Sequence, residues 1–136
     1  MHTIGVSVEF DSAHRLFPYE GKCSNIHGHR YKLEVAFVGD TSSNAMVIDF
    51  GVVKDGLKRI IEEKLDHKLI LSIADPIKDA LATYDVSMLL LPDSPTAESL
   101  VSYIHLLLSK EFLSYWPEIK ISYIRLYETP TCYAEI

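Results

Sequence analysis

The stretch that decides the fold runs Ile4-Gly5-Val6-Ser7-Val8-Glu9-Phe10-Asp11-Ser12-Ala13-His14. Its large apolar residues occupy even positions up to Phe10, whereas glycine, serine and acidic residues occupy the odd positions. An alternation with a period of two is typical of a strand that buries one face. If this strand continues past Phe10 without a bulge, the side chain of His14 lies on the buried face.

A second alternation places Tyr31, Leu33, Val35 and Phe37 on one face, against Arg30, Lys32 and Glu34 on the other. Residues i and i+2 of a strand point to the same face, so extending this alternation back from Tyr31 places His27 and His29 on the apolar face. The intervening segment, Arg15–Ile26, contains Pro18, Gly21, Asn25 and several polar residues. This composition indicates a long loop, of a length that is often functional. We therefore expect an antiparallel hairpin with this loop at its tip, and with His14 close to the other two histidines.

Two helices and two further strands follow. Asp49 can cap a first helix, and Ser94 or Thr96 can cap a second. Residues 119–128 and 131–136 predict two closing strands. The apolar residues recur at helical spacing in both helices, at Val53, Leu57, Ile60, Ile61 and Leu65 in the first, and at Ala97, Leu100, Val101, Ile104, Leu107 and Leu108 in the second.

This order of elements predicts an α+β fold, in which a four-stranded antiparallel sheet carries two helices on one face in the order ββααββ. The segment Lys68–Pro92 fits that scheme least well. Within it, residues 77–84 are compatible with a short helix and residues 86–91 with a strand.

Length and charge narrow the class of protein. A chain of 136 residues is expected to form one domain, residues 1–136. Its formal net charge of −6 argues against nucleic acid or an anionic membrane as the main partner.

No apolar stretch approaches the roughly 18–20 residues that span a bilayer, and the first residues lack the features of a signal peptide. Two cysteines are too few for a disulfide scaffold, so we expect a cytoplasmic protein.

Three imidazoles that converge from one face suit a zinc ion with an open fourth position, as in catalytic zinc sites. The alternative is that His14, His27 and His29 are ordinary core histidines with satisfied hydrogen bonds. Cys23 lies in the loop, where a nearby cation would favour its thiolate and allow it to act as a base or nucleophile. The alternative is an inert loop cysteine, and the second cysteine, Cys132, is expected in the core.

Two other polar features have simple explanations. Asp66-His67 could be a carboxylate that orients a general base, but the end of a helix, where a histidine favours the helix dipole, is the better interpretation of these two residues alone. Glu128 precedes a predicted turn and is expected to be exposed.

Taken together, these pieces resemble the 6-pyruvoyl-tetrahydropterin synthase / 6-carboxytetrahydropterin synthase family. The matching motifs occur in the same order from residue 10 to the C-terminus. They are Phe10-Asp11-Ser12-Ala13-His14-Arg15-Leu16, Cys23-x-x-x-His27-Gly28-His29-x-Tyr31, Val47-Ile48-Asp49-Phe50, Leu65-Asp66-His67-Lys68, Pro95-Thr96-Ala97-Glu98 and Glu128-Thr129-Pro130-Thr131.

The resemblance implies the tunnelling fold (T-fold), in which subunits close their sheets into a trimeric barrel and two trimers stack as a homohexamer. It implies that His14, His27 and His29 bind Zn2+ and that Cys23 is the general base. Asp66 and His67 would be its proton-relay partners, brought from a neighbouring subunit, while Glu128 would anchor a pterin ring with Thr129 nearby.

The substrate implied is 7,8-dihydroneopterin triphosphate, with loss of triphosphate and acetaldehyde to give 6-carboxy-5,6,7,8-tetrahydropterin in queuosine biosynthesis. The gap of three residues between Cys23 and His27, and the sequence of residues 128–131, resemble this bacterial lyase branch. The alternatives are a 6-pyruvoyl-tetrahydropterin synthase, a paralogue with another pterin substrate, or a non-catalytic protein that binds pterin or metal. Arg15, Lys22 and Arg30 are candidates for contact with the triphosphate.

Overall fold

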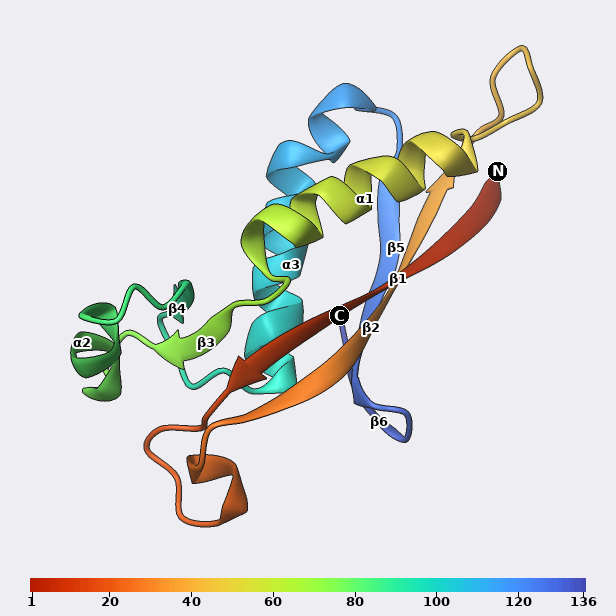
Figure 1. Ribbon diagram of the computed structural model, residues 1–136. Helices are drawn as coiled ribbons and strands as arrows, with labels where there is room; N and C mark the ends of the chain where they lie inside the picture. The colour runs from red at the N-terminus through yellow and green to blue at the C-terminus, as the bar shows by residue number, and fades with distance from the viewer.

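The fold is built around one long antiparallel hairpin. The computed structural model describes residues 1–136, and in it strands β1 (His2–His14) and β2 (His27–Gly39) pair along their whole length. The two strands cross the molecule from end to end (Figure 1). Alternate residues of both strands are buried, and the rings of Phe10 and Tyr31 stack with centroids 5.1 Å apart. The predicted hairpin and its parity are confirmed.

The sheet is larger than the sequence predicted. Strands β5 (Lys120–Thr129) and β6 (Cys132–Glu135) extend it antiparallel beyond β2, as expected. Beyond β1 it continues with β3 (Leu69–Ser72) and β4 (Met88–Leu91), which are parallel to β1 and to each other. The strand order is β4-β3-β1-β2-β5-β6.

The predicted four-stranded antiparallel sheet in the order ββααββ is therefore wrong in its details, because the sheet is mixed and has six strands. The difference comes from residues 68–92, which form a short β3–α2–β4 unit around helix α2 (Ile77–Ala82). Parallel neighbours such as β3 and β4 need a crossover connection, and α2 lies in that crossover. The α+β class remains correct.

Both long helices cover one face of the sheet (Figure 1). Helix α1 (Phe50–Lys64) begins after Asp49, whose carboxylate accepts hydrogen bonds from the backbone N–H groups of Gly51 and Val52. Helix α3 (Ala97–Glu111) is capped by Thr96. Two short 3-10 helices, η1 (Lys22–Ser24) and η2 (Leu113–Tyr115), complete the elements. The buried residues of both helices pack against the buried residues of β1, β2 and β5 in one core.

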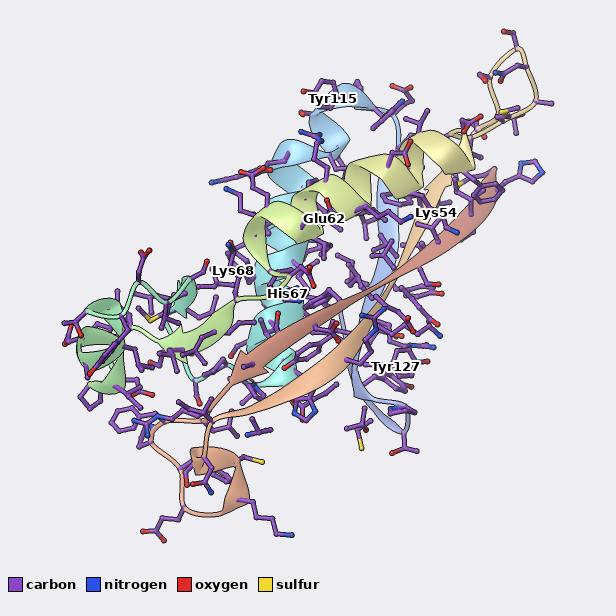
Figure 2. All side chains as sticks on the ribbon, in the orientation of Figure 1. Lys54, Glu62, His67, Lys68, Tyr115 and Tyr127 are labelled. Carbon is purple, nitrogen blue, oxygen red and sulfur yellow. The ribbon has the colours of Figure 1, made fainter.

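The opposite face of the sheet has no helix over it (Figure 1). It is polar, and ion pairs cross its strands, for example from Arg30 to Glu9 and Asp11. The ammonium group of Lys32 lies 5.0 Å from the centre of the Tyr127 ring, which Figure 2 places on this side. No helix of the chain is long and apolar enough to cross a membrane.

One predicted core position is wrong. Cys132 is exposed, because β6 is the outermost strand and nothing in the same chain packs beyond it. Of the two proposed caps of α3, Thr96 has that role. Ser94 instead accepts a hydrogen bond from the backbone N–H of Phe17 at 3.1 Å.

Candidate metal centre

Three imidazoles meet at the end of the hairpin that carries the long loop. In the β1–β2 register His14 is opposite His27, and Ser12 is opposite His29, so the three side chains lie on the helix-covered face. One nitrogen from each ring lies within 4.8 Å of the other two. His14 is 1% exposed, whereas the other two are half-buried. The convergence predicted from strand parity is confirmed.

Backbone carbonyls determine which nitrogen of two rings carries the proton. Nδ1 of His14 lies 2.8 Å from the carbonyl oxygen of Pro95, and Nδ1 of His27 lies 2.7 Å from that of Asn25. A carbonyl only accepts, so each Nδ1 is the donor and each Nε2 of the neutral ring presents a lone pair. Metal-binding histidines are commonly oriented in this way.

The inward-facing nitrogens have no good protein partner. The two Nε2 atoms of His14 and His27 are only 3.1 Å apart, and with both protons on Nδ1 their lone pairs oppose each other. Nε2 of His29 is buried and makes no hydrogen bond. A cation among the three nitrogens would satisfy all of them, so these residues fit a zinc ion with one position open to solvent or substrate.

The electrostatics favour neutral rings. Burial lowers the pKa of His14 and of His29, and the nearby carboxylate of Glu128 opposes this shift only in part. A histidine binds a metal only when its imidazole is neutral, because the binding nitrogen must carry no proton. The environment of these two histidines therefore favours the form that binds a metal.

A cavity of about 250 Å³ adjoins the three-histidine cluster at His14. It brings together His14, Cys23 from η1 and Glu128 from β5, three residues singled out from the sequence. The carboxylate of Glu128 lies 3.6 Å from Nε2 of His29, beyond hydrogen-bond distance. Glu128 is half-buried rather than exposed, and it shares a neighbouring hollow with Thr129.

Sequence reasoning gave no site role to the four other polar residues of this cavity. Thr96 and Glu98 come from the start of α3, and Cys132 and Tyr133 come from β6. The first two lie in the Pro95–Glu98 motif, which was a signal for the site although no role was assigned to it. The other two carried no signal, because their place depends on the turn that returns β6 beside β5.

Asp66 and His67 lie apart from this cavity. Both residues follow α1. His67 borders another hollow, of about 590 Å³, whose lining also includes Asp11, His29, Arg30 and Lys68; Figure 2 labels His67 and Lys68 at this junction. His67 has the left-handed backbone conformation (φ 57°) common just after a helix. Its Nδ1 lies 2.8 Å from the carboxylate of Asp66, and its side chain is 77% exposed.

The Asp66 carboxylate is shared between two partners. Its other oxygen accepts the backbone N–H of Asp11 at 3.0 Å. Partial burial would raise the pKa of Asp66, but the hydrogen bonds from Asp11 and His67 outweigh it and lower the pKa. Within one chain, therefore, an ordered carboxylate–imidazole pair faces outwards and does not reach Cys23.

The three basic residues proposed for a triphosphate differ in availability. Arg15 is paired with the buried carboxylate of Asp75, and Arg30 is paired with Asp11 and Glu9. Lys22 is exposed on η1 next to Cys23 and makes no ion pair. Of the three, only Lys22 has a free charge in the single chain.

The fold and the three-histidine centre together define a pterin-synthase-like α+β protein, and comparisons with known proteins agree. The model of the family described as 6-pyruvoyl tetrahydropterin synthase matches residues 3–136, and the chain belongs to this family. Proteins named 6-carboxy-5,6,7,8-tetrahydropterin synthase are similar to it. That of Rickettsia conorii is 35% identical over 95% of both chains, and that of Aquifex aeolicus is 41% identical over 84% of this chain and 75% of the relative.

Solved structures show the same fold. A protein of Wolinella succinogenes described as uncharacterized superposes with a TM-score of 0.82 at 24% identity, covering 99% of this chain and 97% of the other. A 6-pyruvoyltetrahydropterin synthase of Plasmodium vivax, solved as a mutant of a catalytic residue, superposes with a TM-score of 0.73 at 20% identity, covering 100% and 98%. The mixed extension of the sheet and the three helices thus belong to a fold of this family.

Proposed function

We propose that the chain is a zinc-dependent 6-carboxy-5,6,7,8-tetrahydropterin synthase. It is a lyase that converts 7,8-dihydroneopterin triphosphate to the 6-carboxy product, with release of triphosphate and acetaldehyde, in queuosine biosynthesis. The relatives of that name at 35–41% identity over most of the chain support this reaction. The single structural observation that carries the proposal is the cavity in which Cys23 and Glu128 lie beside the three-histidine centre.

The histidines would hold the zinc ion by their three converging nitrogens. A zinc ion bound there supplies a Lewis acid that polarises substrate oxygens and makes an adjacent C–H group more acidic. Cys23 accepts the proton of that group at its Sγ atom, which requires the thiolate. The carboxylate of Glu128 accepts hydrogen bonds from the ring N–H and amino groups of the pterin, and Thr129 lies next to it.

Asp66 and His67 complete the site from another copy of the chain. Asp66 holds Nδ1 of His67 as a donor and leaves Nε2 free to exchange a proton with a group outside the chain. Because His67 borders a different hollow from Cys23, a complete proton relay needs a neighbouring subunit. We therefore propose a homo-oligomer, a hexamer built as a dimer of trimers, in which each site lies between two chains.

Product analysis tests this function. Zinc-loaded protein is incubated with 7,8-dihydroneopterin triphosphate, and the products are identified by mass. Formation of 6-carboxy-5,6,7,8-tetrahydropterin together with acetaldehyde is the expected result. Formation of 6-pyruvoyl-tetrahydropterin without acetaldehyde would assign the chain to the other branch of the family. Tight pterin binding without turnover would instead identify a non-catalytic binding protein.

A further inference from the structure

A buried ion pair lies next to the metal centre and takes no part in the function proposed above. Asp75 is the only acidic residue whose side chain is fully buried. Nε of Arg15 donates to one of its oxygens at 2.7 Å, and Nη2 donates to the other at 2.5 Å. Arg15 directly follows the histidine that ends β1. The pair therefore links the end of that strand to the turn between β3 and α2.

The contact between Arg15 and Asp75 is bidentate. A guanidinium group matches both carboxylate oxygens at once, which a lysine ammonium group cannot do. The carboxylate of Asp75 also accepts the backbone N–H of Ile77 at 3.0 Å. The Arg15 guanidinium and the Ile77 N–H together fix the orientation of the Asp75 carboxylate, and the carboxylate in turn fixes the position of the Arg15 side chain.

Four consecutive residues, 14–17, each make a hydrogen bond to one of three places in the chain, which are the segment 94–95, Asp75 and Cys23. The ring of His14 donates to the carbonyl of Pro95, and the side chain of Arg15 reaches Asp75. The backbone N–H of Leu16 donates to the carbonyl of Cys23 at 2.8 Å, and that of Phe17 donates to Ser94. The residue that binds Asp75 therefore stands between a metal ligand and the residue that anchors the proposed base.

The loop of residues 15–26 has few other attachments. Its hydrogen bonds to distant parts of the chain occur at only two places, Arg15 to Asp75 and Phe17 to Ser94. The remaining hydrogen bonds of the loop, such as those around η1, are local. Loss of the ion pair would leave Phe17 to Ser94 as the only hydrogen bond from the loop to a distant part of the chain.

We propose that the Arg15–Asp75 pair is a positioning device for the site, which holds Cys23 and His14 in place without touching metal or substrate. The inference rests on the proposed metal centre but not on the identity of the substrate. It also gives residues 69–92, which extend the sheet, a role in the chemistry. Arg15 is then occupied by a structural partner and does not contact the triphosphate.

The test compares three variants with the wild-type protein. Asp75→Asn removes the charge of the partner, and Arg15→Lys keeps the cation but loses the bidentate contact. The double variant Arg15→Gln/Asp75→Asn leaves no unpaired charge behind, which matters because breaking a buried pair can destabilise the fold by itself. The matched control is Asp79→Asn, which removes an exposed ion pair of α2 with Lys78.

Two readouts are independent of turnover. The first is the affinity for Co2+ as a zinc substitute, from its absorption spectrum in competition with a chelator. The second is the rate at which iodoacetamide alkylates Cys23 in the metal-free protein, measured in a Cys132→Ser background so that only one thiol reacts. Thermal unfolding of each variant is recorded in parallel.

We expect about a tenfold loss of Co2+ affinity in the three variants, the lower end of the range for residues that orient metal ligands. Cys23, which is half-buried in the wild type, should react faster as the loop loosens, and the Asp79→Asn control should match the wild type in both readouts. Variants that unfold at lower temperature while Co2+ affinity and alkylation rate stay unchanged would overturn the inference.

The outcomes also separate this inference from the proposed function. If Asp75→Asn does not fold, the double variant decides by the same criteria. If the wild type binds no Co2+, the proposed metal centre is refuted. The alkylation rate of Cys23 then decides the inference alone. Equal rates in the wild type and the variants would contradict a positioning role.

Discussion

Cys23 is placed beside the three histidines by a loop rather than by a regular strand. It lies in η1, at the bottom of the view in Figure 1, and borders the same cavity as His14 and Glu128. A thiol in such a place is available for proton transfer without being needed to bind the metal. We propose that Cys23 acts as a general base and that it does not bind the metal, and one substitution tests both statements.

We expect Cys23→Ala to lower kcat by about 10²- to 10⁴-fold, the usual contribution of a general base, while the zinc content of each subunit stays that of the wild type. Steady-state kinetics and metal analysis of the same sample measure both. Ser24→Ala, on the same short helix, is the control and should retain activity. A Cys23→Ala protein with full activity would remove the thiol from the mechanism.

The buried environment of two of the proposed ligands predicts how metal binding depends on pH. Burial lowers the pKa of His14 and His29 below the usual value of about 6.5. Protons then compete with the metal only at lower pH than they would at exposed imidazoles. Zinc affinity, measured by competition with a chelator, should change little from pH 8 to about 6.5 and fall below that. A steady loss of affinity between pH 8 and 7 would contradict this environment.

At the scale of single elements, the β1–β2 hairpin was the most predictable part. Each strand alternates over many residues, so parity alone places His14, His27 and His29 on one face, and the register confirms it. Helix α1 was predictable for a similar reason, because both its cap and its apolar stripe are local features of the sequence.

The β3–α2–β4 unit could not be predicted in the same way. Its strands have four residues each, and all four residues of β3 are buried, so no alternation marks it. The side chain that connects the unit to the site, Asp75, is 60 residues from its partner Arg15. Local patterns carry no information about such a pair, and the same holds for Cys132 in the cavity.

The cap of α1 gives a quantitative test at this scale. Asp49 accepts two backbone N–H groups at the start of the helix, at 2.7 and 3.3 Å. Asp49→Ala should lower the free energy of unfolding by about 1 kcal/mol, whereas Asp49→Asn should be nearly neutral. Urea denaturation measures both. Equal losses for the two variants would show that the negative charge, rather than the cap hydrogen bonds, matters.

At the scale of the whole molecule, the proposed catalytic residues lie on two different surfaces of one chain. Cys23 and His67 border different hollows. Apart from each other, the side chains of Asp66 and His67 have one hydrogen-bond partner in the chain, the backbone N–H of Asp11. The adjacency of Asp66 and His67 was visible in the sequence. Their separation from Cys23 was not visible in the sequence, because it depends on which face of the hairpin each residue packs against in the folded chain.

Mixing two inactive variants tests this division. Cys23→Ala and His67→Ala subunits, co-expressed in equal amounts, should form some sites with an intact thiol from one chain and an intact imidazole from the next. Random assembly would restore about a quarter of wild-type activity. Each variant alone is the control. A mixture no more active than its components would place both residues in the site of a single chain.

The hydrogen bond from His14 to Pro95 also has a consequence for how the protein is made. The three proposed metal ligands lie within the first 29 residues, but the carbonyl that orients His14 comes 81 residues after it. A ribosome exposes the imidazoles long before it has synthesised their last support. We therefore expect metal captured during translation to be held loosely, and the final coordination to form only when the start of α3 docks onto the finished hairpin.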